Sequence, residues 1–324
     1  MRYDTSKKAF SLIELSIVLL IIGIIIAGVT QSSRLIRQFK ITTAQNKTSS
    51  GPVASIKNLG LWYETTLTDS FIDFEAQDSA TASNPISTWK DINPQNSTKN
   101  NATQNININK PLYDSGCINI LPCLKFDGVS SFMNFDGSFL VGTDYTIFVI
   151  FQRRNGGVNG SGSIIGRLTT TALNQSIELG HFADSGGHAV FAFGQGDPNN
   201  YYVVGSANPT IPAFSTPSPA LHVIVNSTIA SGQSTFAHYY NGYRSSNIRT
   251  ASTLTSVGTP SAMQSLTSFP DAIIGHDITL DTLVGRAHLN GDLGEIIIYT
   301  RALKNEERIV VEDYLMQKWG ISEL

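Results

Sequence analysis

The sequence predicts a mainly β protein in which a long N-terminal helix precedes a β-sandwich domain that closes with a second helix. Three observations lead to this fold class. Residues 10–30 form one apolar run, short segments punctuated by Gly, Asn and Pro fill the middle of the chain, and the C-terminal segment has a helical pattern. We expect a helix over residues 10–50, a linker over 51–58 and the sandwich with its closing helix over 59–324.

The apolar run at residues 10–30, FSLIELSIVLLIIGIIIAGVT, contains one ionisable side chain, Glu14. At about 1.5 Å per residue, a helix of this length spans the roughly 30 Å hydrocarbon core of a bilayer. The run is longer than the core of a typical signal peptide, and no small-residue cleavage site follows it. A carboxylate inside a membrane helix costs about 2.5–3.5 kcal/mol, so Glu14 needs a partner or a function there.

Beyond the apolar run the pattern stays helical and becomes amphipathic. Leu35 and Phe39 fall one turn apart, and Gly51-Pro52 predicts the end of the helix. The same segment carries a stripe of basic residues, which is either a solvated helix face or a surface that packs against acidic neighbours. Its members recur every three positions: Arg34, Arg37 and Lys40.

From about residue 59 the pattern has the period of β-strands. DYTIFVIFQRR (144–154) is apolar on both faces, which predicts a strand buried on each side. Many short strands indicate a β-sandwich, with surface loops at the Asn-rich 93–109 and the Pro-rich 209–219. The other expected strands lie at 124–128, 131–135, 163–167, 176–180, 188–194, 200–205, 221–227, 236–242, 271–275 and 293–300.

The closing helix is expected over residues 305–318. Asn305 can cap it, Glu306 and Glu307 lie at its positive end, and Gly320 can end it in a left-handed turn. Four residues are expected to bury one stripe of this helix against the sandwich: Ile309, Val310, Tyr314 and Trp319.

Composition limits the function classes. Charged residues make up 15% of the chain, and the net charge is −3. Since no basic patch accompanies stacking aromatics, nothing indicates a nucleic-acid partner. Cys117 and Cys123 lie six positions apart, and they either form a disulfide in an oxidising compartment or stay as two buried thiols.

The segment KKAFSLIEL (7–15) resembles the processing site of the type IV pilin and type II secretion pseudopilin family. The resemblance implies that a leader, residues 1–9, is cut off between Ala9 and Phe10 by the prepilin peptidase. It also implies that the Phe10 amine is then methylated and that Glu14 serves filament assembly. The chain departs from the family at one position, because Ala9 stands where the family nearly always has Gly.

The same resemblance implies a location and partners. The chain would enter the inner membrane as a single-pass protein with its C-terminal domain on the periplasmic side. It would then join other pilin or pseudopilin subunits in a pilus or pseudopilus, or at the cell surface. Charge gives no independent orientation, because three basic residues precede the apolar run and four follow it through Lys47.

Four segments of the predicted sandwich resemble the concanavalin A-like, laminin G-like jelly-roll domains, a fold that includes lectins and glucanases. They are LWYE with STWKD (61–64 and 87–91), LKFDGVSSFMNF (124–135), DYTIFVIFQRR (144–154) and GDLGEIIIYTRALKNEERIVVEDYLMQKWGI (291–321). The resemblance implies a jelly roll and an association with glycan or protein-ligand binding. It names no ligand, because function belongs to the site rather than the fold.

Candidate sites are few. Glycoside hydrolases of this fold carry Glu-x-Asp-x-x-Glu on one strand, and the nearest run here, residues 73–78, has the wrong order. We therefore expect no catalytic residues and no enzyme activity. No cofactor is expected, unless the domain binds calcium through the oxygen ligands of three aspartates: Asp271, Asp277 and Asp281.

Two further patterns are better explained without a ligand. His181-x-x-Asp184-x-x-x-His188 surrounds a Gly-rich turn, which is typical of a hairpin end rather than a metal site. Trp62 and Trp89 could stack on a sugar, but core packing is the simpler interpretation.

These observations predict a pilus or pseudopilus subunit, in a minor or tip position, that displays a lectin-like adhesive domain. Two other functions stay open. One is a membrane-anchored carbohydrate-active enzyme of the same fold, and the other is a structural pseudopilin without a ligand.

Overall fold

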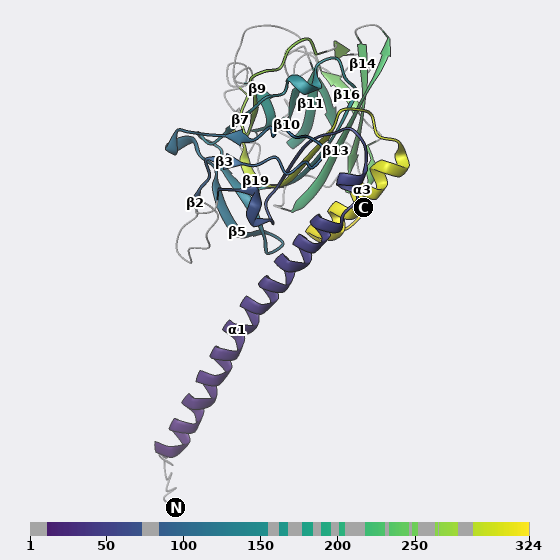
Figure 1. The fold of residues 1–324 in the computed structure, drawn as a ribbon. Coiled ribbons are helices and arrows are strands. Elements are labelled where there is room, and N and C mark those ends of the chain that lie inside the picture. The colour runs from purple at the N-terminus through teal and green to yellow at the C-terminus, as the bar shows by residue number, and fades with distance from the viewer. Residues whose placement is uncertain are drawn as a thin grey trace, which may run out of the picture.

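One continuous helix, α1 (Leu12–Ser50), extends away from a β-rich domain in the computed structural model (Figure 1). We call α1 the stem and residues 51–323 the head. The 39 residues of the stem form a rod about 58 Å long, and it ends just before Gly51, as predicted. The structure describes residues 12–72, 84–154, 162–167, 177–183, 189–195, 201–204, 218–230, 233–245, 248–251, 263–264, 266–277 and 288–323.

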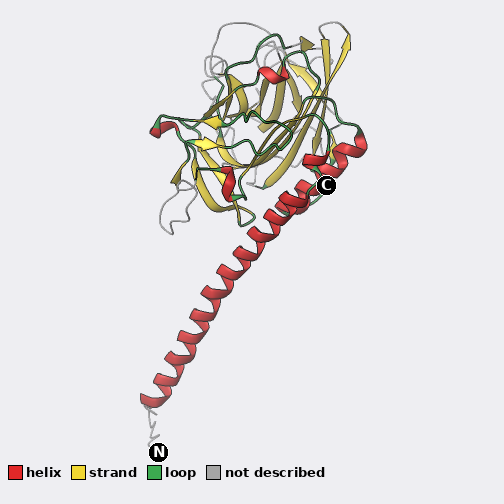
Figure 2. Cartoon of the chain, in the orientation of Figure 1, coloured by secondary structure: helices red, strands yellow, loops and turns green. Residues whose placement is uncertain are grey.

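Two antiparallel sheets form the two layers of the head, with ten and nine strands within the described ranges (Figure 2). The first sheet runs in the order β15 (Tyr243–Arg244), β14 (Gln233–Tyr240), β13 (Pro219–Ala230), β8 (Tyr145–Arg153), β19 (Asn290–Tyr299), β6 (Leu121–Asp127), β5 (Leu112–Ile118), β2 (Asn84–Pro85). In addition, two strands pair beside this path, β1 (Leu59–Glu64) with β19 and β17 (Met263–Gln264) with β14.

The second sheet runs in the order β16 (Ile248–Ala251), β12 (Tyr201–Val204), β11 (Ala189–Gln195), β10 (Ile177–Ala183), β9 (Gly162–Arg167), β18 (Ala272–Ile274), β7 (Met133–Phe135), β4 (Ala102–Thr103), β3 (Thr88–Trp89). Short 3-10 helices join some of the elements: η1 (Val53–Ser55), η2 (Thr68–Ser70), η3 (Asn107–Asn109) and η4 (Ser138–Leu140). The mainly β sandwich that the sequence predicts is confirmed.

The central strand β8 is buried on both faces. Ile147, Val149 and Phe151 belong to the core between the two sheets. Phe148 and Ile150, on the alternate face, belong to a second core on the outside of the first sheet. The prediction of a doubly buried strand is therefore confirmed, and the outer face needs its own cover.

Helix α3 (Asn305–Trp319) provides that cover (Figure 1). Its Trp319 ring lies against β19, where a Cβ on Gly294 would approach the ring to 2.6 Å, so this position requires glycine. The helix starts after Lys304, whose N–H donates to Glu307 at 3.1 Å, and the prediction that Asn305 is the cap was wrong. Gly320 ends the helix with φ 65°, as predicted.

The buried stripe of α3 differs from the predicted one. Tyr314 and Trp319 are buried as expected, but Ile309 and Val310 are 46% and 48% exposed. Their expected places are taken by an ion pair between two buried residues of the helix, Arg308 and Glu312. Pairing lets charged side chains occupy core positions that hydrophobicity alone assigns to Ile and Val.

The segment expected to be a linker, residues 51–58, packs against the rest of the head. Val53 is fully buried, and its carbonyl accepts a hydrogen bond from the Tyr299 hydroxyl at 2.9 Å. The Arg301 guanidinium donates to the Lys57 carbonyl at 3.1 Å. The stem therefore enters the head through a fixed segment.

Expected strands that fall within the described ranges are present, and several others were missed. The longest missed strand is β5, LYDSGCI, where Asp114 and Gly116 interrupt the alternation of polar and apolar residues. It pairs with β6 to form a hairpin that reaches the stem.

Candidate functional site

The N-terminal end of the stem follows the predicted processing site. Ala9 and Phe10 lie outside the described residues, which begin at Leu12, so cleavage and methylation there stay predictions. Glu14 lies in the first turn of α1. Searched over the described part of the chain, no helix combines the length and the hydropathy that crossing a membrane requires.

The stem displays apolar side chains on its surface. Leu35, Ile36 and Phe39 are 67%, 55% and 73% exposed. Exposed apolar surface of this extent marks a contact with another protein or with lipid. The same kind of surface continues toward the N-terminus, over Leu12, Ile13, Leu15, Ile17, Val18, Leu19, Leu20, Ile21, Ile22, Ile24, Ile25 and Ile26.

The other end of the stem is seated on the head. Ala44 and Thr48, one turn apart, are 2% and 3% exposed. The Gln45 amide donates to the Thr66 carbonyl at 2.9 Å, and the Tyr314 hydroxyl lies 3.5 Å from the Thr48 hydroxyl. These contacts hold the C-terminal turns of the stem beside α3.

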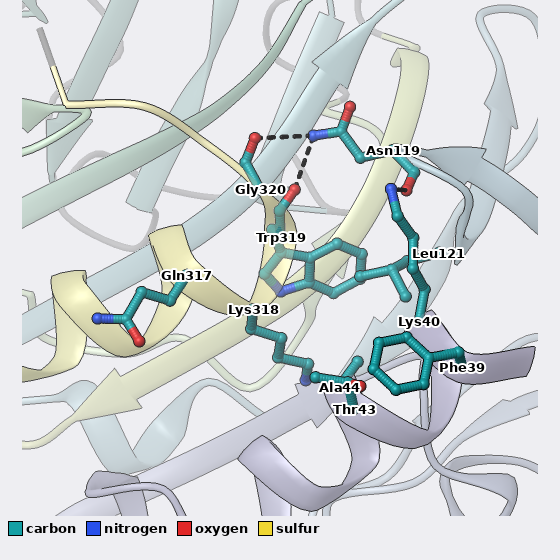
Figure 3. A pocket seen from close by; sticks show the side chains of 10 residues that line it. All are labelled: Phe39, Lys40, Thr43, Ala44, Asn119, Leu121, Gln317, Lys318, Trp319 and Gly320. Carbon is teal, nitrogen blue, oxygen red and sulfur yellow. Dashed lines mark hydrogen bonds between the residues drawn. The ribbon is translucent and has the colours of Figure 1, made fainter. Parts of the chain in front are cut away.

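A cavity of about 170 Å³ lies where the stem, α3 and the tip of the β5–β6 hairpin meet (Figure 3). Apolar atoms of Ala44, Leu121 and Trp319 line it. The Lys40 ammonium reaches across to the Asn119 carbonyl at 3.4 Å. At this cavity the stem contacts two parts of the head, α3 and the hairpin tip.

A fully buried charge cluster lies next to the contact between the stem and the head. The Lys318 ammonium lies 2.9 Å from a Glu64 oxygen and 2.8 Å from a Glu295 oxygen, and all three side chains are 0% exposed. Glu64 comes from β1, Glu295 from β19 and Lys318 from α3. The cluster therefore joins the first strand, the last strand and the covering helix of the head.

Neighbouring donors satisfy both carboxylates. Glu64 accepts from Thr66, Leu67 and Ser70, which follow it in the chain. Glu295 accepts at 2.8 Å from the indole N–H of Trp62, at 2.8 Å from that of Trp319 and at 3.0 Å from the Tyr314 hydroxyl. A buried charge that is paired and hydrogen-bonded in this way is tolerated in a core.

Lys318 and Glu64 are both stabilised in their ionised forms, although burial alone would favour the neutral forms. Burial by itself would lower the pKa of Lys318, but Glu295 and Glu64 together raise it above its usual value. Burial would likewise raise the pKa of Glu64, yet Lys318 and the Thr66 and Leu67 donors hold it below the usual value. The cluster carries charge at neutral pH and holds the structure together where no solvent reaches.

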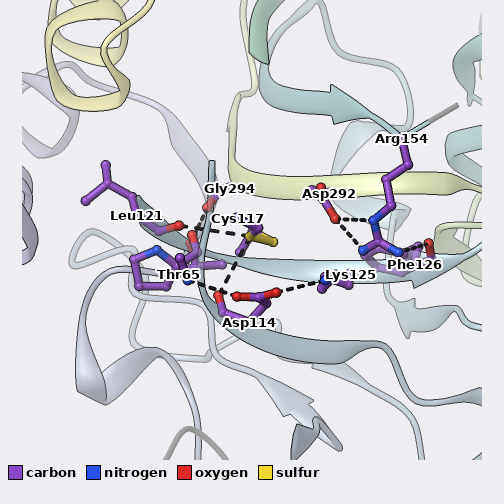
Figure 4. The surroundings of a disulfide bond; sticks show 12 residues. Thr65, Asp114, Cys117, Leu121, Lys125, Phe126, Arg154, Asp292 and Gly294 are labelled. Atoms are coloured by element: carbon purple, nitrogen blue, oxygen red, sulfur yellow. Dashed lines mark hydrogen bonds and ion pairs between the residues drawn. A yellow bond between two sulfur atoms is a disulfide. The ribbon is translucent and has the colours of Figure 1, made fainter. Parts of the chain in front are cut away.

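A disulfide joins Cys117 and Cys123 across the β5–β6 hairpin, with their Cα atoms 6.0 Å apart (Figure 4). Cys123 is fully buried, and Cys117 is partly exposed. Beside it, Lys125 pairs with Asp114 at 2.8 Å. The bond closes the hairpin just behind its tip.

The calcium site stays a prediction, because one of its three candidate ligands is not described. Asp277 is fully buried, Asp271 is partly exposed, and Asp281 lies outside the described residues. Over the described ranges, one group of three possible ligand residues has its ligand atoms within 4.8 Å of one another, namely Cys117, Cys123 and Asp292. The disulfide removes two of these three ligands.

The two other patterns have structural roles where they are described. Trp62 and Trp89 are 4% and 0% exposed, which confirms that they pack in the core. His181 lies on β10, in the hairpin with β11, whereas Asp184 and His188 lie outside the described residues.

Three buried imidazoles cross the core from one sheet to the other. The ring of His181, on β10, lies 5.1 Å from that of His222, on β13, centroid to centroid. His222 Nδ1 lies 3.1 Å from Nε2 of His238, on β14. His238 Nδ1 then lies 2.7 Å from the Ser245 hydroxyl. This trio has no counterpart in the sequence pattern, because its members are far apart along the chain.

Burial keeps these imidazoles neutral. It lowers the pKa of His181 to about 3, with Arg153 and His238 adding to the shift. It lowers the pKa of His238 to about 3 and that of His222 well below its ordinary value. The folded head therefore resists protonation at a pH where the unfolded chain accepts protons.

The chain carries a prepilin-like N-terminal motif, since residues 4–30 match the family model described as the prokaryotic N-terminal methylation motif. No protein with a curated description matches the chain. The family model covers the start of the stem and does not reach the head.

Several solved structures resemble the chain at low identity. The Trypanosoma rangeli sialidase in complex with 2,3-difluorosialic acid is 12% identical with a TM-score of 0.41, over 88% of this chain and 39% of that chain. An arabinofuranosidase complexed with arabinofuranosyl-α-1,2-xylobiose is 12% identical with a TM-score of 0.45, over 72% and 51%. The binding domain of botulinum neurotoxin serotype D is 10% identical with a TM-score of 0.46, over 82% and 53%. This chain thus spans about 39–53% of the length of these proteins.

Sequence reasoning missed the Lys318 cluster. A signal was present, because Glu64 and Glu295 each stand in an otherwise apolar strand, LGLWYE and NGDLGEIIIY. An acidic residue in such a position needs a buried cation. Which cation it finds, 254 positions away in the chain, cannot be read from the pattern.

Replacing Lys318 with Met should lower the free energy of unfolding by about 3–5 kcal/mol, because two buried carboxylates lose their cation. Urea unfolding followed by tryptophan fluorescence measures this. Lys57→Met, at an exposed lysine, is the control and should change stability by less than about 0.5 kcal/mol. Equal free energies of unfolding of the two variants would show that the cluster contributes little to the stability of the head.

Acid should destabilise the head before its carboxylates titrate. Unfolded histidines take up protons near pH 6.5, whereas the folded head holds the pKa of His181 and His238 at about 3 and that of His222 well below its ordinary value. The unfolded state therefore binds more protons as the pH falls below 6.5. Stability is complete above about pH 6.5 and falls as the pH drops, by up to about 1.4 kcal/mol per pH unit for each histidine. Urea unfolding between pH 7 and pH 5 measures the slope. His222→Gln should reduce it by about a third, and an unchanged slope would exclude the trio as its source.

Proposed function

We propose that the protein is a prepilin-like subunit of a type IV pilus or type II secretion pseudopilus, in a minor or tip position, whose head binds a glycan or protein ligand. One observation carries the proposal. The methylation motif at residues 4–30 continues without interruption into a 39-residue helix whose apolar side chains are exposed on its surface.

The stem explains how such a subunit is held. Its apolar surface favours lipid before assembly and the stems of neighbouring subunits afterwards. Processing between Ala9 and Phe10 would create a cationic amine four residues from Glu14. A pair between this amine and the Glu14 of a neighbouring chain would then stabilise the assembly, because opposite charges attract strongly where water is excluded.

The size of the head supports a minor or tip position. The described strands of the head form sheets of ten and nine strands, whereas the stem that carries them is about 10–12 Å wide with its side chains. A head on every neighbouring stem would crowd the filament surface, whereas a head at the tip would be free to meet a ligand.

Ligand binding is proposed from the sequence resemblance of the head to lectin-like jelly rolls. The resembling segments form β1, β3, β6, β7, β8, β19 and α3, so they supply the centre and the cover of the first sheet and the edge of the second. We propose no enzyme activity, since the paired-carboxylate run of the hydrolases of this fold is missing from the sequence.

Glu14→Ala should leave membrane insertion and the folded head intact, because it makes the apolar segment more apolar. The filament-bound fraction should fall about tenfold or more, which corresponds to about 1.4 kcal/mol per lost contact. Sheared filaments and membranes are compared by immunoblot. Ser16→Ala, in the next turn, is the matched control and should assemble normally.

Two results would contradict the assembly role. Normal recovery of Glu14→Ala in filaments would show that Glu14 does not mediate assembly. Mass spectrometry of the same material should find a mature N-terminus at methylated Phe10, and an intact Met1 would exclude processing.

The ligand is tested with the purified full-length chain on a glycan array. We expect binding to a restricted set of glycans. If the chain binds none of the arrayed glycans, a structural pseudopilin without a glycan ligand is favoured. Turnover of an arrayed polysaccharide would instead favour the membrane-anchored enzyme.

A further inference from the structure

We propose that the Cys117–Cys123 disulfide is a redox-sensitive clamp that keeps the C-terminal part of the stem seated on the head. The proposal concerns the junction between the two parts of the molecule and is independent of what the head binds. It rests on the geometry of the hairpin tip and on the contacts that the tip makes.

The tip is a tight two-residue turn. Ile118 pairs with Leu121, and the residues between them, Asn119 and Ile120, both have left-handed backbone with φ 47° and 72°. Two consecutive residues of this kind form the turn that suits the twist of a β-hairpin. Asn tolerates this conformation, but β-branched Ile does not favour it, so the turn has to be held by its surroundings.

The disulfide holds the turn from behind. Cys117 precedes the turn pair and Cys123 follows it, so the bond closes a short loop around the turn (Figure 4). Between Asp114 and Ile118 the pairing of β5 with β6 is irregular. The covalent bond thus fixes the tip where the backbone ladder is weakest.

The tip in turn ties α3 and the stem together (Figure 3). The Asn119 amide donates to the Trp319 carbonyl at 2.7 Å and to the Gly320 carbonyl at 3.1 Å, at the C-terminal end of α3. The carbonyl of the same residue accepts from Lys40 of the stem at 3.4 Å. Asn119 therefore hydrogen-bonds to both helices, to α3 through its side chain and to the stem through its carbonyl.

The bond can be reached by a dithiol reductant. Cys117 is partly exposed, whereas Cys123 is fully buried, so a thiolate of the reductant attacks the Cys117 sulfur. The S–S bond breaks, and Cys123 leaves and takes up a proton. The second thiol of the reductant then displaces Cys117, which leaves as a thiol. Two electrons and two protons pass to the protein, and the reductant becomes a cyclic disulfide.

Reduction frees the tip and leaves the core between the two sheets in place, because that core contains neither cysteine. Ile118, Leu121 and Cys123 belong to the second core instead, which also includes Ala44 of the stem. The Lys318 cluster and the two sheets hold the head through contacts that do not involve the hairpin tip. The stem loses the hydrogen bond between Lys40 and Asn119, and the contact of residues 40–50 with the head loosens.

Hydrogen exchange of the full-length chain in detergent, before and after dithiothreitol, tests this. Alkylation confirms that both cysteines are reduced. Amides of residues 40–50 should exchange about fivefold faster or more after reduction, while those of β8 and β19 should not change. Unchanged exchange at residues 40–50 would overturn the proposal. An equal increase over β8 and β19 would also overturn it, because the bond would then support the whole head.

Two variants separate the clamp from general loosening. The double variant Cys117→Ser/Cys123→Ser should exchange like the reduced chain and should not respond to dithiothreitol. Asn119→Gly keeps the turn conformation and the carbonyl that accepts from Lys40, but it removes the side-chain amide that anchors the tip to α3. The tip and its carbonyl are then no longer fixed, so the oxidised variant should already show fast exchange at residues 40–50. Asn105→Gly, at an exposed asparagine elsewhere, is the control. Wild-type exchange in oxidised Asn119→Gly would show that the tip does not link the stem to the bond.

Discussion

The head depends on one buried cation. Lys318 sits between Glu64 and Glu295, and none of the three side chains is exposed. A charge without solvent is stable when every partner is in place, so the cluster fixes the relative positions of β1, β19 and α3 at once. Tyr314 extends the same network to the stem through Thr48.

The head and the stem are arranged in successive layers around this cluster. The first sheet has one core against the second sheet and another beneath α3, and the stem lies against α3 in its turn. A helix that covers a sheet and carries a second helix has two interfaces to satisfy. Trp319 lies against β19, and Tyr314 reaches the Thr48 hydroxyl of the stem.

Much of the fold could be predicted because it depends on local periodicity. The apolar pattern of the stem, the Gly51-Pro52 stop and the doubly apolar β8 each follow from neighbouring residues. Pairing over long distances could not be predicted. The sequence places Ile309 and Val310 inside because they are apolar, but Arg308 and Glu312 are buried as an ion pair. The junction is invisible in the same way, since Asn119 meets Trp319 across 200 positions.

Attachment of the stem decides where a mechanical load enters the sandwich. The stem leads through the packed segment 51–58 to Leu59, the first residue of β1, and β1 lies along β19. If the far side of the head is held and the stem is pulled, tension therefore reaches the β1–β19 ladder before the core between the sheets. Glu64 anchors the opposite end of β1 to Lys318. The C-terminal helix therefore braces the strand through which such a load would enter.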